Sequence, residues 1–442
     1  MREMKDSGIE WIGNIPATWE RCKIKNVISS IGSGTTPTSS NIDYYNSEDI
    51  RWIQSGDLYK TSYISNTAVS LSAKALHLSA LQIYAAPFIV VAMYGASVGN
   101  IAISTIDACS NQACCCIKPD NNNDLKFMYY WLSMCKIDFL SQSIGSGQPN
   151  ISQSKIKNQF YYRPQLSEQK VIANFLDSKC SEIDAISADI QKEIETLEQY
   201  KRSVITEAVT KGLNPDAEMK DSSVEWVGII PASWTSSRLG YETYIRARLG
   251  WKGLKADEYV DEGYAFISAF NIQNNKLVWT PLNYITKERY DESPEIKLHI
   301  GDVIIVKDGA GIGKCARIDS LPMGETAPNS SIGVITPLAK LNYRYLAYYL
   351  QSAIFNNLIL KLLNGMGVPH LTQEVLNKTP ILLPPKQEQV RIANFLDSKC
   401  CEIDSAIETK KKQIDILDAY KKSLIYEYVT GKKGVPAQNE LR

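Results

Sequence analysis

Two long stretches of the chain alternate apolar and polar residues with the period of an α-helix. Residues 168–209 and 388–429 contain no proline or glycine and are rich in residues that favour helix. Apolar residues recur in each stretch at heptad spacing, which predicts a coiled-coil seam. The seam positions are Leu176, Ile183, Ile190, Leu197 and Val204 in the first stretch, with Ile172, Ile186 and Ile194 between them, and Leu396, Ile403, Leu417 and Leu424 in the second, with Ile407 and Ile414 between them and Lys410 as an interruption.

Each of these apolar stripes would be exposed to water on an isolated helix. A single stretch of this kind is usually just a long packing helix. Two equivalent stripes in one chain, each roughly 63 Å long at 1.5 Å per residue, are buried most simply against each other. A pseudo-twofold relation between the copies would make them antiparallel, so we expect an antiparallel coiled coil.

The chain is an internal repeat, and the helices are part of it. Residues 4–19 return as residues 219–234, and residues 172–180 return as residues 392–400. The segment that starts at Tyr200 returns at Tyr420. The regions between these repeated segments hardly match each other. A duplicated frame with two divergent inserts suggests one shared mechanical role for the frame and a different recognition task for each insert.

The two divergent middles, residues 20–163 and 235–383, contain short β-rich runs broken by turn residues, followed by a helical stretch. We therefore expect an α+β protein in which two mixed α/β domains are joined by two long helices. The predicted segments are 1–163 (entry segment and first domain), 164–212 (first helix), 213–383 (second entry segment and second domain), 384–434 (second helix) and 435–442 (tail).

The charge balance limits how the chain could bind a polyanion. Among its 442 residues, 48 lysines and arginines match 48 aspartates and glutamates, so any nucleic-acid binding must come from local patches.

The N-terminus has no apolar leader core, and no apolar run is long enough to span a bilayer. The sequence predicts a cytoplasmic protein with no membrane partner.

The ten cysteines are expected to be reduced and mostly buried. Cys109 and the run 114–116 cluster in sequence but lack paired C-x-x-C spacing, and the three histidines are scattered. We therefore predict no metal site and no cofactor.

Three segments were compared with catalytic motifs, and each lacks residues that the motif requires. Residues 309–314 resemble a phosphate-binding loop, but Asp308 replaces its first glycine and Cys315 its final hydroxyl residue. The base-holding motif of DNA methyltransferases is absent around residues 383–386. Residues 294–297, with Asp291 or Asp261, resemble part of a metal-nuclease signature. We expect no catalytic residues and no enzyme activity, and a stand-alone nuclease stays as the weaker alternative.

The entry sequence Lys-Asp-Ser-Gly-Ile-Glu-Trp-Ile-Gly-x-Ile-Pro-x-x-Trp at residues 5–19, the Pro-x-x-x-Glu-Gln-x-x-Ile-Ala-x-Phe-Leu-Asp run at residues 164–177 and the two-copy layout together resemble the specificity subunit of Type I restriction-modification systems. The resemblance covers essentially the whole chain. It implies that each middle is a target-recognition domain for one half of a bipartite, asymmetric site in double-stranded DNA. It also implies that the helices form a spacer that docks two methylation subunits, with restriction subunits joining through the complex.

Two loops add to the resemblance. Residues 32–37 and 52–57 are similar to loops of such recognition domains. The second divergent region has a different sequence, residues 246–252, at the position that corresponds to residues 32–37.

Base recognition needs polar side chains of particular types. Asparagine and glutamine suit adenine and arginine suits guanine in the major groove, while lysines position the phosphates. For each candidate the alternative is an ordinary solvated side chain. The predicted DNA-binding residues are Lys23, Arg51, Gln54, Tyr94, Gln148 and Asn150 in the first domain, and Arg246, Arg248, Lys252, Asn271, Lys307 and His370 in the second. The rival class of function is a scaffold that presents two protein-binding domains and binds no DNA.

Overall fold

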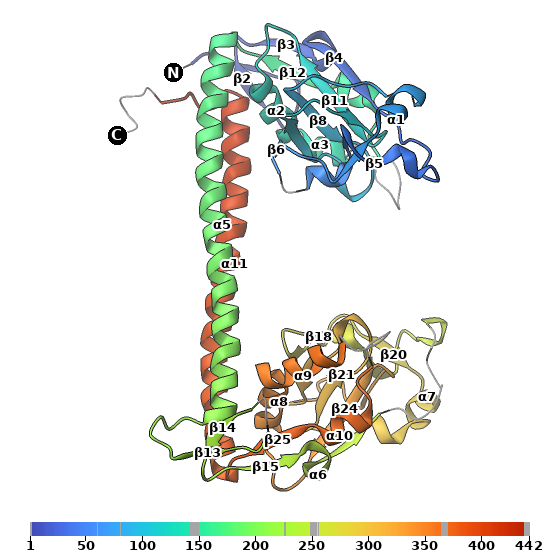
Figure 1. Cartoon of the computed structure of the whole chain (residues 1–442). Coiled ribbons are helices and arrows are strands. Elements are labelled where there is room, and N and C mark those ends of the chain that lie inside the picture. Colours follow the sequence, from blue (N-terminus) through green and yellow to red (C-terminus); the bar gives the residue numbers. More distant parts are fainter. Residues whose placement is uncertain are drawn as a thin grey trace. The chain divides into compact units, whose positions relative to one another are not determined.

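The computed structural model describes residues 2–59, 61–79, 81–141, 150–224, 227–247, 254, 256–363 and 370–436 (Figure 1). The chain forms two compact units: unit 1 comprises residues 1–190 and 412–442, and unit 2 comprises residues 191–411. Each unit contains one mixed α/β domain, part of the long helix that follows this domain and part of the other long helix. The predicted fold class, two mixed α/β domains with two long helices and an internal repeat, is confirmed.

Unit 1 contains a five-stranded sheet of order β4-β11-β8-β9-β6 and a three-stranded sheet of order β10-β5-β7. Its strands are β1 (Met4–Asp6), β2 (Asn14–Pro16), β3 (Glu20–Lys23), β4 (Ile28–Ser33), β5 (Tyr45–Ile53), β6 (Tyr63–Ile64), β7 (Val69–Leu71), β8 (Phe88–Ala92), β9 (Ile101–Ser104), β10 (Cys109–Ser110), β11 (Cys114–Pro119) and β12 (Phe160–Arg163). Its short helices are η1 (Ile24–Asn26), η2 (Ile42–Tyr44), η3 (Ser55–Leu58), α1 (Ala73–Leu78), η4 (Gly95–Ser97), α2 (Leu125–Met134), α3 (Lys136–Ser141) and α4 (Gln153–Asn158).

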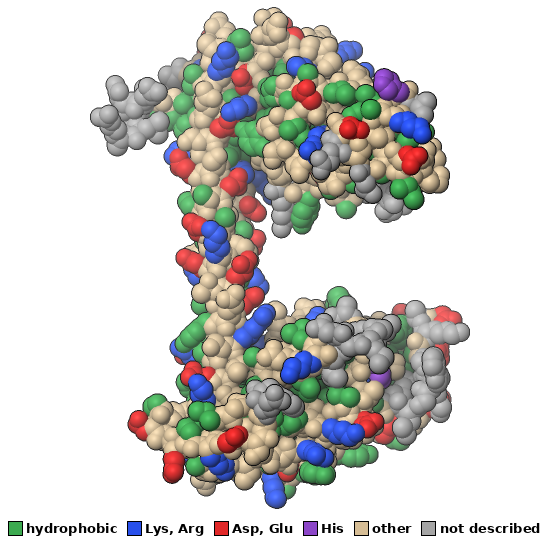
Figure 2. Space-filling view, viewed as in Figure 1, with side chains coloured by type: hydrophobic (Ala, Val, Ile, Leu, Met, Phe, Trp, Pro, Cys, Tyr) green, Lys and Arg blue, Asp and Glu red, His purple; other side chains and the backbone are tan. Residues whose placement is uncertain are grey.

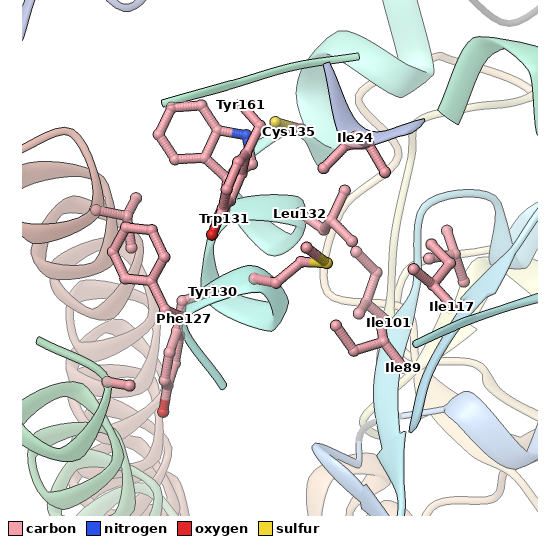
Figure 3. Packing of buried hydrophobic residues seen from close by; sticks show 14 of the residues in the cluster. Ile24, Ile89, Ile101, Ile117, Phe127, Tyr130, Trp131, Leu132, Cys135 and Tyr161 are labelled. Carbon is pink, nitrogen blue, oxygen red and sulfur yellow. The ribbon is translucent and has the colours of Figure 1, made fainter. Parts of the chain in front are cut away.

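The core of this domain follows from strand alternation. Side chains on one face of β8 and β11, such as Ile89 and Ile117, pack with Trp131 and Leu132 of α2 (Figure 3). Side chains on the other face, such as Val90, form a second cluster. Because successive side chains of a strand point to opposite faces, a fully apolar strand such as β8 is buried on both.

Unit 2 repeats this plan with a four-stranded sheet of order β16-β24-β21-β22 and a three-stranded sheet of order β20-β17-β23. Its strands are β13 (Met219–Asp221), β14 (Ile229–Pro231), β15 (Thr235–Arg238), β16 (Thr243–Arg246), β17 (Tyr264–Ile267), β18 (Ile272–Gln273), β19 (Lys276–Leu277), β20 (Asn283–Ile285), β21 (Val303–Val306), β22 (Cys315–Arg317), β23 (Thr326–Pro328), β24 (Ile332–Pro337) and β25 (Pro380–Leu383). Its short helices are α6 (Leu239–Glu242), η5 (Ala256–Glu258), η6 (Ala269–Asn271), α7 (Lys287–Asp291), η7 (Pro294–Ile296), η8 (Gly309–Gly311), α8 (Tyr343–Gln351), α9 (Ala353–Leu363) and α10 (Gln373–Lys378).

The long helices are α5 (Leu166–Lys211) and α11 (Lys386–Val429), and they pack antiparallel within each unit. In unit 1, Phe175 packs on Tyr428 and the Asp184 carboxylate pairs with Lys421 at 2.7 Å. In unit 2, the Asp404 carboxylate pairs with Lys201 at 2.5 Å. As residue numbers rise along α5, those of its partners fall along α11. The predicted antiparallel pairing is therefore confirmed.

Burial follows the predicted seam with one exception. Leu176, Ile183, Leu396, Ile403 and Leu424 are buried. The remaining seam positions are partly buried: Ile190, Leu197, Val204 and Leu417.

The exception is Ile186, which was predicted to fill a position between seam residues and is instead 50% exposed. The inward position one residue later is held by Ser187, whose hydroxyl is buried. Lys201 and Lys421 also occupy seam positions, where each pairs with an aspartate of the opposite helix. The seam is thus more polar than the sequence pattern indicated, since that pattern showed only the interruption at Lys410.

A repeated glutamine attaches each domain to its long helix. Gln389 is 1% exposed; its carbonyl accepts from the Asn342 backbone N–H at 2.8 Å, and its amide donates to the carbonyls of Pro384 at 2.9 Å and Lys340 at 3.0 Å. Gln169 makes the equivalent contacts in unit 1, accepting from the Asp124 N–H at 2.8 Å and donating to backbone carbonyls. Because the partners are backbone groups, this attachment tolerates side-chain changes in the domain.

The repeated entry segments cover the ends of the long helices. A side chain on Gly431, just after α11, would collide with Pro16 and come within 3.0 Å of Trp19. Gly212, at the end of α5, lies in the same way against Trp234. Both glycines have positive φ angles, 68° and 75°, as expected for residues that end a helix in the left-handed conformation.

The cysteines are mostly buried, as predicted. Burial raises the pKa of the Cys109 thiol to about 11 and that of Cys116 to about 12, so these thiols are protonated and pack as small apolar groups. Among the described residues, no helix combines the length and hydropathy needed to cross a membrane.

Replacing Gln389 by alanine should lower the free energy of unfolding by about 2–3 kcal/mol, because it leaves buried backbone groups without partners. Chemical denaturation of the chain would measure this loss. Gln413→Ala, at an exposed position of the same helix, is the matched control and should change stability by less than about 0.5 kcal/mol. Equal effects of the two substitutions would contradict the attachment role.

Candidate nucleic-acid interface

Both domains build the same loop cluster at the end of their central strand. In unit 1, η4 follows β8, and Tyr94 pairs in an isolated β-bridge with Asn150. In unit 2, η8 follows β21, and Asp308 pairs in the same way with His370. The bridge holds two segments next to each other although they are far apart in the sequence, so each domain presents a preorganised edge.

Glycines explain the shape of this edge. Gly95 and Gly309 begin η4 and η8 with φ angles of 70° and 80°. These left-handed conformations favour glycine. A Cβ built on either residue meets no atom within 4 Å, so conformation, not lack of space, demands glycine. Glycine therefore sets the tight turn at the start of each short helix.

A second short helix lies beside the first in each domain. In unit 1, η3 contacts η4, and the Gln54 N–H that precedes η3 donates to Asp57 at 2.8 Å. In unit 2, a side chain on Gly311 of η8 would meet Ala269 of η6 at 3.9 Å. The two turns together form one surface in each domain, defined as the loop edge: residues 54–58, 94–99 and 150 in unit 1, and residues 268–270, 307–313 and 370 in unit 2.

Three of the predicted residues, Tyr94, Asn150 and His370, lie on these edges with exposed side chains, and Gln54 and Lys307 join them in partly buried positions. Tyr94 is 42% exposed and Asn150 is exposed. In unit 2, the Lys307 ammonium lies 3.3 Å from the Asp308 carboxylate, and the His370 imidazole bonds to the same carboxylate. The first edge therefore offers neutral polar groups and an aromatic ring, and the second a group of charged and imidazole side chains.

Sequence reasoning missed Phe270, which is 64% exposed on η6. The matching position on η3 is Gly56, so the repeat gives no signal for it. An apolar side chain on a rigid polar edge suits contact with a thymine methyl group.

Two predicted residues lie on strands away from these edges. The ammonium of Lys23, on β3, lies 5.7 Å from the Phe160 ring. The guanidinium of Arg51, on β5, donates to the Ser70 hydroxyl at 3.2 Å. Gln148, Arg248 and Lys252 lie outside the described residues.

Arg246 and Asn271 were predicted to contact DNA but are buried, 8% and 4% exposed. The Arg246 guanidinium pairs with the Asp302 carboxylate at 2.7 Å and donates to the Lys297 carbonyl at 3.2 Å. The Asn271 amide donates to the Pro281 carbonyl at 2.9 Å and accepts from the Ser268 N–H at 3.0 Å. Both side chains stabilise the domain from inside and are not part of the candidate interface.

The visible face of each domain carries no dominant basic field. Figure 2 shows lysines and arginines interspersed with acidic side chains on the visible face of each domain. This agrees with the zero net charge of the chain. Contacts to a polyanion would then come from individual cations at the loop edges.

The residues of the nuclease-like segment are engaged with each other. The Lys297 ammonium pairs with Asp291 at 2.6 Å and lies 4.0 Å from the Tyr290 ring. Across the described part of the chain, no three acidic, histidine or cysteine side chains are grouped so as to hold a metal ion.

Arg246→Ala should destabilise the chain by about 3–5 kcal/mol, because it leaves the buried Asp302 carboxylate without its charged partner. Thermal or denaturant unfolding would measure this effect. Arg238→Ala, at an exposed position in the same domain, should be nearly neutral. A fully stable Arg246→Ala variant that has lost DNA binding would instead return Arg246 to the interface.

The family model described as "Type I restriction modification DNA specificity domain" matches residues 16–196 and 250–419. The chain is 28% identical over 309 residues to the Type I restriction enzyme MjaVIII specificity subunit of Methanocaldococcus jannaschii, covering 69% of each chain. It is 24% identical over 440 residues to the MjaIX specificity subunit of the same organism, covering 95% of this chain and 94% of that one.

A solved structure described as the structural basis of complex assembly and conformational transition of the type I R-M system superimposes with a TM-score of 0.69 at 15% identity, covering 95% of this chain and 99% of that chain. At this identity the superposition shows a shared fold. The family model covers both halves of the internal repeat, including the strands and turns that form the loop edges. The chain therefore belongs to the family of Type I restriction-modification DNA specificity domains.

Proposed function

We propose that this chain is the non-catalytic specificity subunit that recognises a bipartite, asymmetric site in double-stranded DNA and directs methylation and restriction subunits to it. One observation carries the proposal: a duplicated frame presents two loop edges of the same construction but with different side chains. Two readers of different specificity on one frame suit a site made of two different halves.

The loop edges have the properties that base reading requires. Each is held by a backbone bridge and by short capped helices, so little flexibility is lost on binding. Asn150 suits bidentate bonding to adenine, and Gln54 offers the same amide group. Lys307 and His370 can donate to phosphates or to base acceptors. Bases are read in this proposal by a few side chains, and a broad basic field is not needed.

The long helices are the proposed docking surface for two methylation subunits. They carry large apolar side chains that are accessible to a partner: Val171 is 53% exposed, Phe395 42%, Ile416 66% and Tyr420 55%. In this proposal, these exposed apolar side chains are contact points for the partner subunits. Because the helices belong to the repeat, two equivalent partners can bind, and restriction subunits would then join through the complex.

Exchanging residues 20–163 for those of a related subunit should change one half of the modified motif and leave the other half unchanged, because each loop edge belongs to a separate domain. Long-read detection of modified adenines in cells that carry the hybrid would report both halves. The reciprocal exchange of residues 235–383 is the control and should change only the other half. If either exchange altered both halves, modular recognition would be wrong.

The purified chain should shift duplex DNA in low salt, more strongly with its methylation subunits present, and the shift should weaken steeply as salt rises. It should show no methyltransferase, nuclease or ATPase turnover alone. Capture of a protein ligand without any DNA binding would favour the scaffold function. Magnesium-dependent cleavage by the chain alone would favour the nuclease.

A further inference from the structure

A repeated aspartate lies where each domain meets the long helices. Asp177 and Asp397 occupy the same place in the repeated segments 172–180 and 392–400. The Asp397 carboxylate accepts from Arg317 at 2.6 Å, from Arg344 at 2.8 Å and from the Tyr348 hydroxyl at 2.7 Å. Its side chain is 26% exposed, so these bonds are partly shielded from water.

The equivalent carboxylate in unit 1 is bound by the same chemical types. Asp177 accepts from the Tyr130 hydroxyl at 2.7 Å, from the Lys126 ammonium and, more weakly, from the Tyr63 hydroxyl at 3.5 Å. Its side chain is 22% exposed. Each carboxylate therefore accepts from at least one cation and one tyrosine, and Asp397 accepts from a second cation, Arg317.

The donors come from the two domains that have otherwise diverged. Lys126 and Tyr130 lie one turn apart on α2, and Arg344 and Tyr348 lie one turn apart on α8. The third donor in each unit comes from a strand, β6 in unit 1 and β22 in unit 2. Two domains with different loop-edge residues thus place their donors in the same way around the aspartate of the long helix.

Electrostatics agrees with this geometry at Asp397. Burial tends to raise the pKa of the carboxyl, but the bonds from Tyr348, Arg317 and Arg344 outweigh it, and the pKa lies below its ordinary value of 3.8. The carboxylate is therefore ionised at neutral pH. Charged hydrogen bonds with several donors restrict orientation more tightly than apolar packing does.

A second pair of aspartates one heptad further along has a different task. Asp184 pairs with Lys421 and Asp404 with Lys201 across the two helices. These pairs set the register of α5 against α11. Asp404 also receives Lys276 from the β18–β19 hairpin at 3.0 Å. The Asp184 pair therefore joins the two helices, whereas Asp404 bonds both to the opposite helix and to the second domain.

We propose that Asp177 and Asp397 are positioning residues that fix the orientation of each recognition domain on the helices and thereby the length of the gap between the two half-sites. The inference rests on the proposed function. Neither aspartate contacts a base in this proposal; each acts through the domain that it holds. Loss of one carboxylate should allow sites with other gap lengths to be methylated, without changing the bases that are read.

The test uses the chain assembled with its methylation subunits and duplexes that carry both half-sites. Three duplexes have the natural gap, one base pair more and one base pair less. The wild-type complex should methylate only the natural gap efficiently. Asp397→Asn should reduce that discrimination on the order of tenfold, since it removes the charge from bonds that hold the domain, and the modified half-sites should stay the same.

Asp418→Asn, at an exposed position of α11, is the matched control and should keep the wild-type discrimination. Tyr348→Phe removes a single hydrogen bond and replaces Asp397→Asn in the test if that variant fails to assemble. It should also reduce the discrimination between gap lengths, by a smaller factor. Asp177→Asn should act likewise through the first domain.

The outcomes are distinguishable. Variants that assemble, bind DNA and keep the wild-type gap discrimination would overturn this inference and leave the proposed function intact. A change in the bases that are read would also overturn it. A wild-type complex that methylates no two-part site would instead refute the proposed function itself.

Discussion

The rest of the structure depends on the antiparallel pairing of α5 with α11. Neither helix alone could bury its apolar stripe. The core of each unit also contains side chains from a segment of the other long helix. Lys201 and Lys421 interrupt the apolar seam, yet each has an aspartate opposite it. A shift of one helical turn would separate these pairs and leave partly buried charges unpaired, so the lysines select one register where Leu and Ile alone would allow several.

This constraint also explains how the domains can diverge while the frame stays the same. Gln169 and Gln389 bond to backbone groups of the domains, and backbone groups are present whatever the side chains are. Trp19 and Trp234 cover the glycines that end the helices and belong to the repeated entry segments. The side chains on the loop edges are outside these contacts, so they can change with little effect on assembly.

The sequence predicted the architecture better than the interface, for a physical reason. Heptads and repeats are periodic, so α5, α11 and their antiparallel pairing could be inferred from spacing. Ile186 was misplaced because an apolar residue one position off the seam looks the same in a pattern as one on it. Arg246 and Asn271 were misassigned because polarity does not reveal burial: Asp302 meets Arg246 only through the pairing of β16, β24 and β21. Phe270 was missed because its exposure depends on the fold of η6.

The repeated aspartates of the long helices limit how recognition can change. The carboxylates of Asp184 and Asp404 pair with lysines of the opposite helix, and Asp404 also pairs with Lys276 of the second domain, whereas those of Asp177 and Asp397 bond to the domains alone in the contacts described above. A new domain must therefore present a cation and a tyrosine one turn apart on the helix that follows its sheet, as α2 and α8 both do. Lysine serves in one domain and arginine in the other, because either cation can bond a carboxylate. The requirement is one of charge and spacing, which two otherwise dissimilar sequences can meet, and the loop edges remain free to differ.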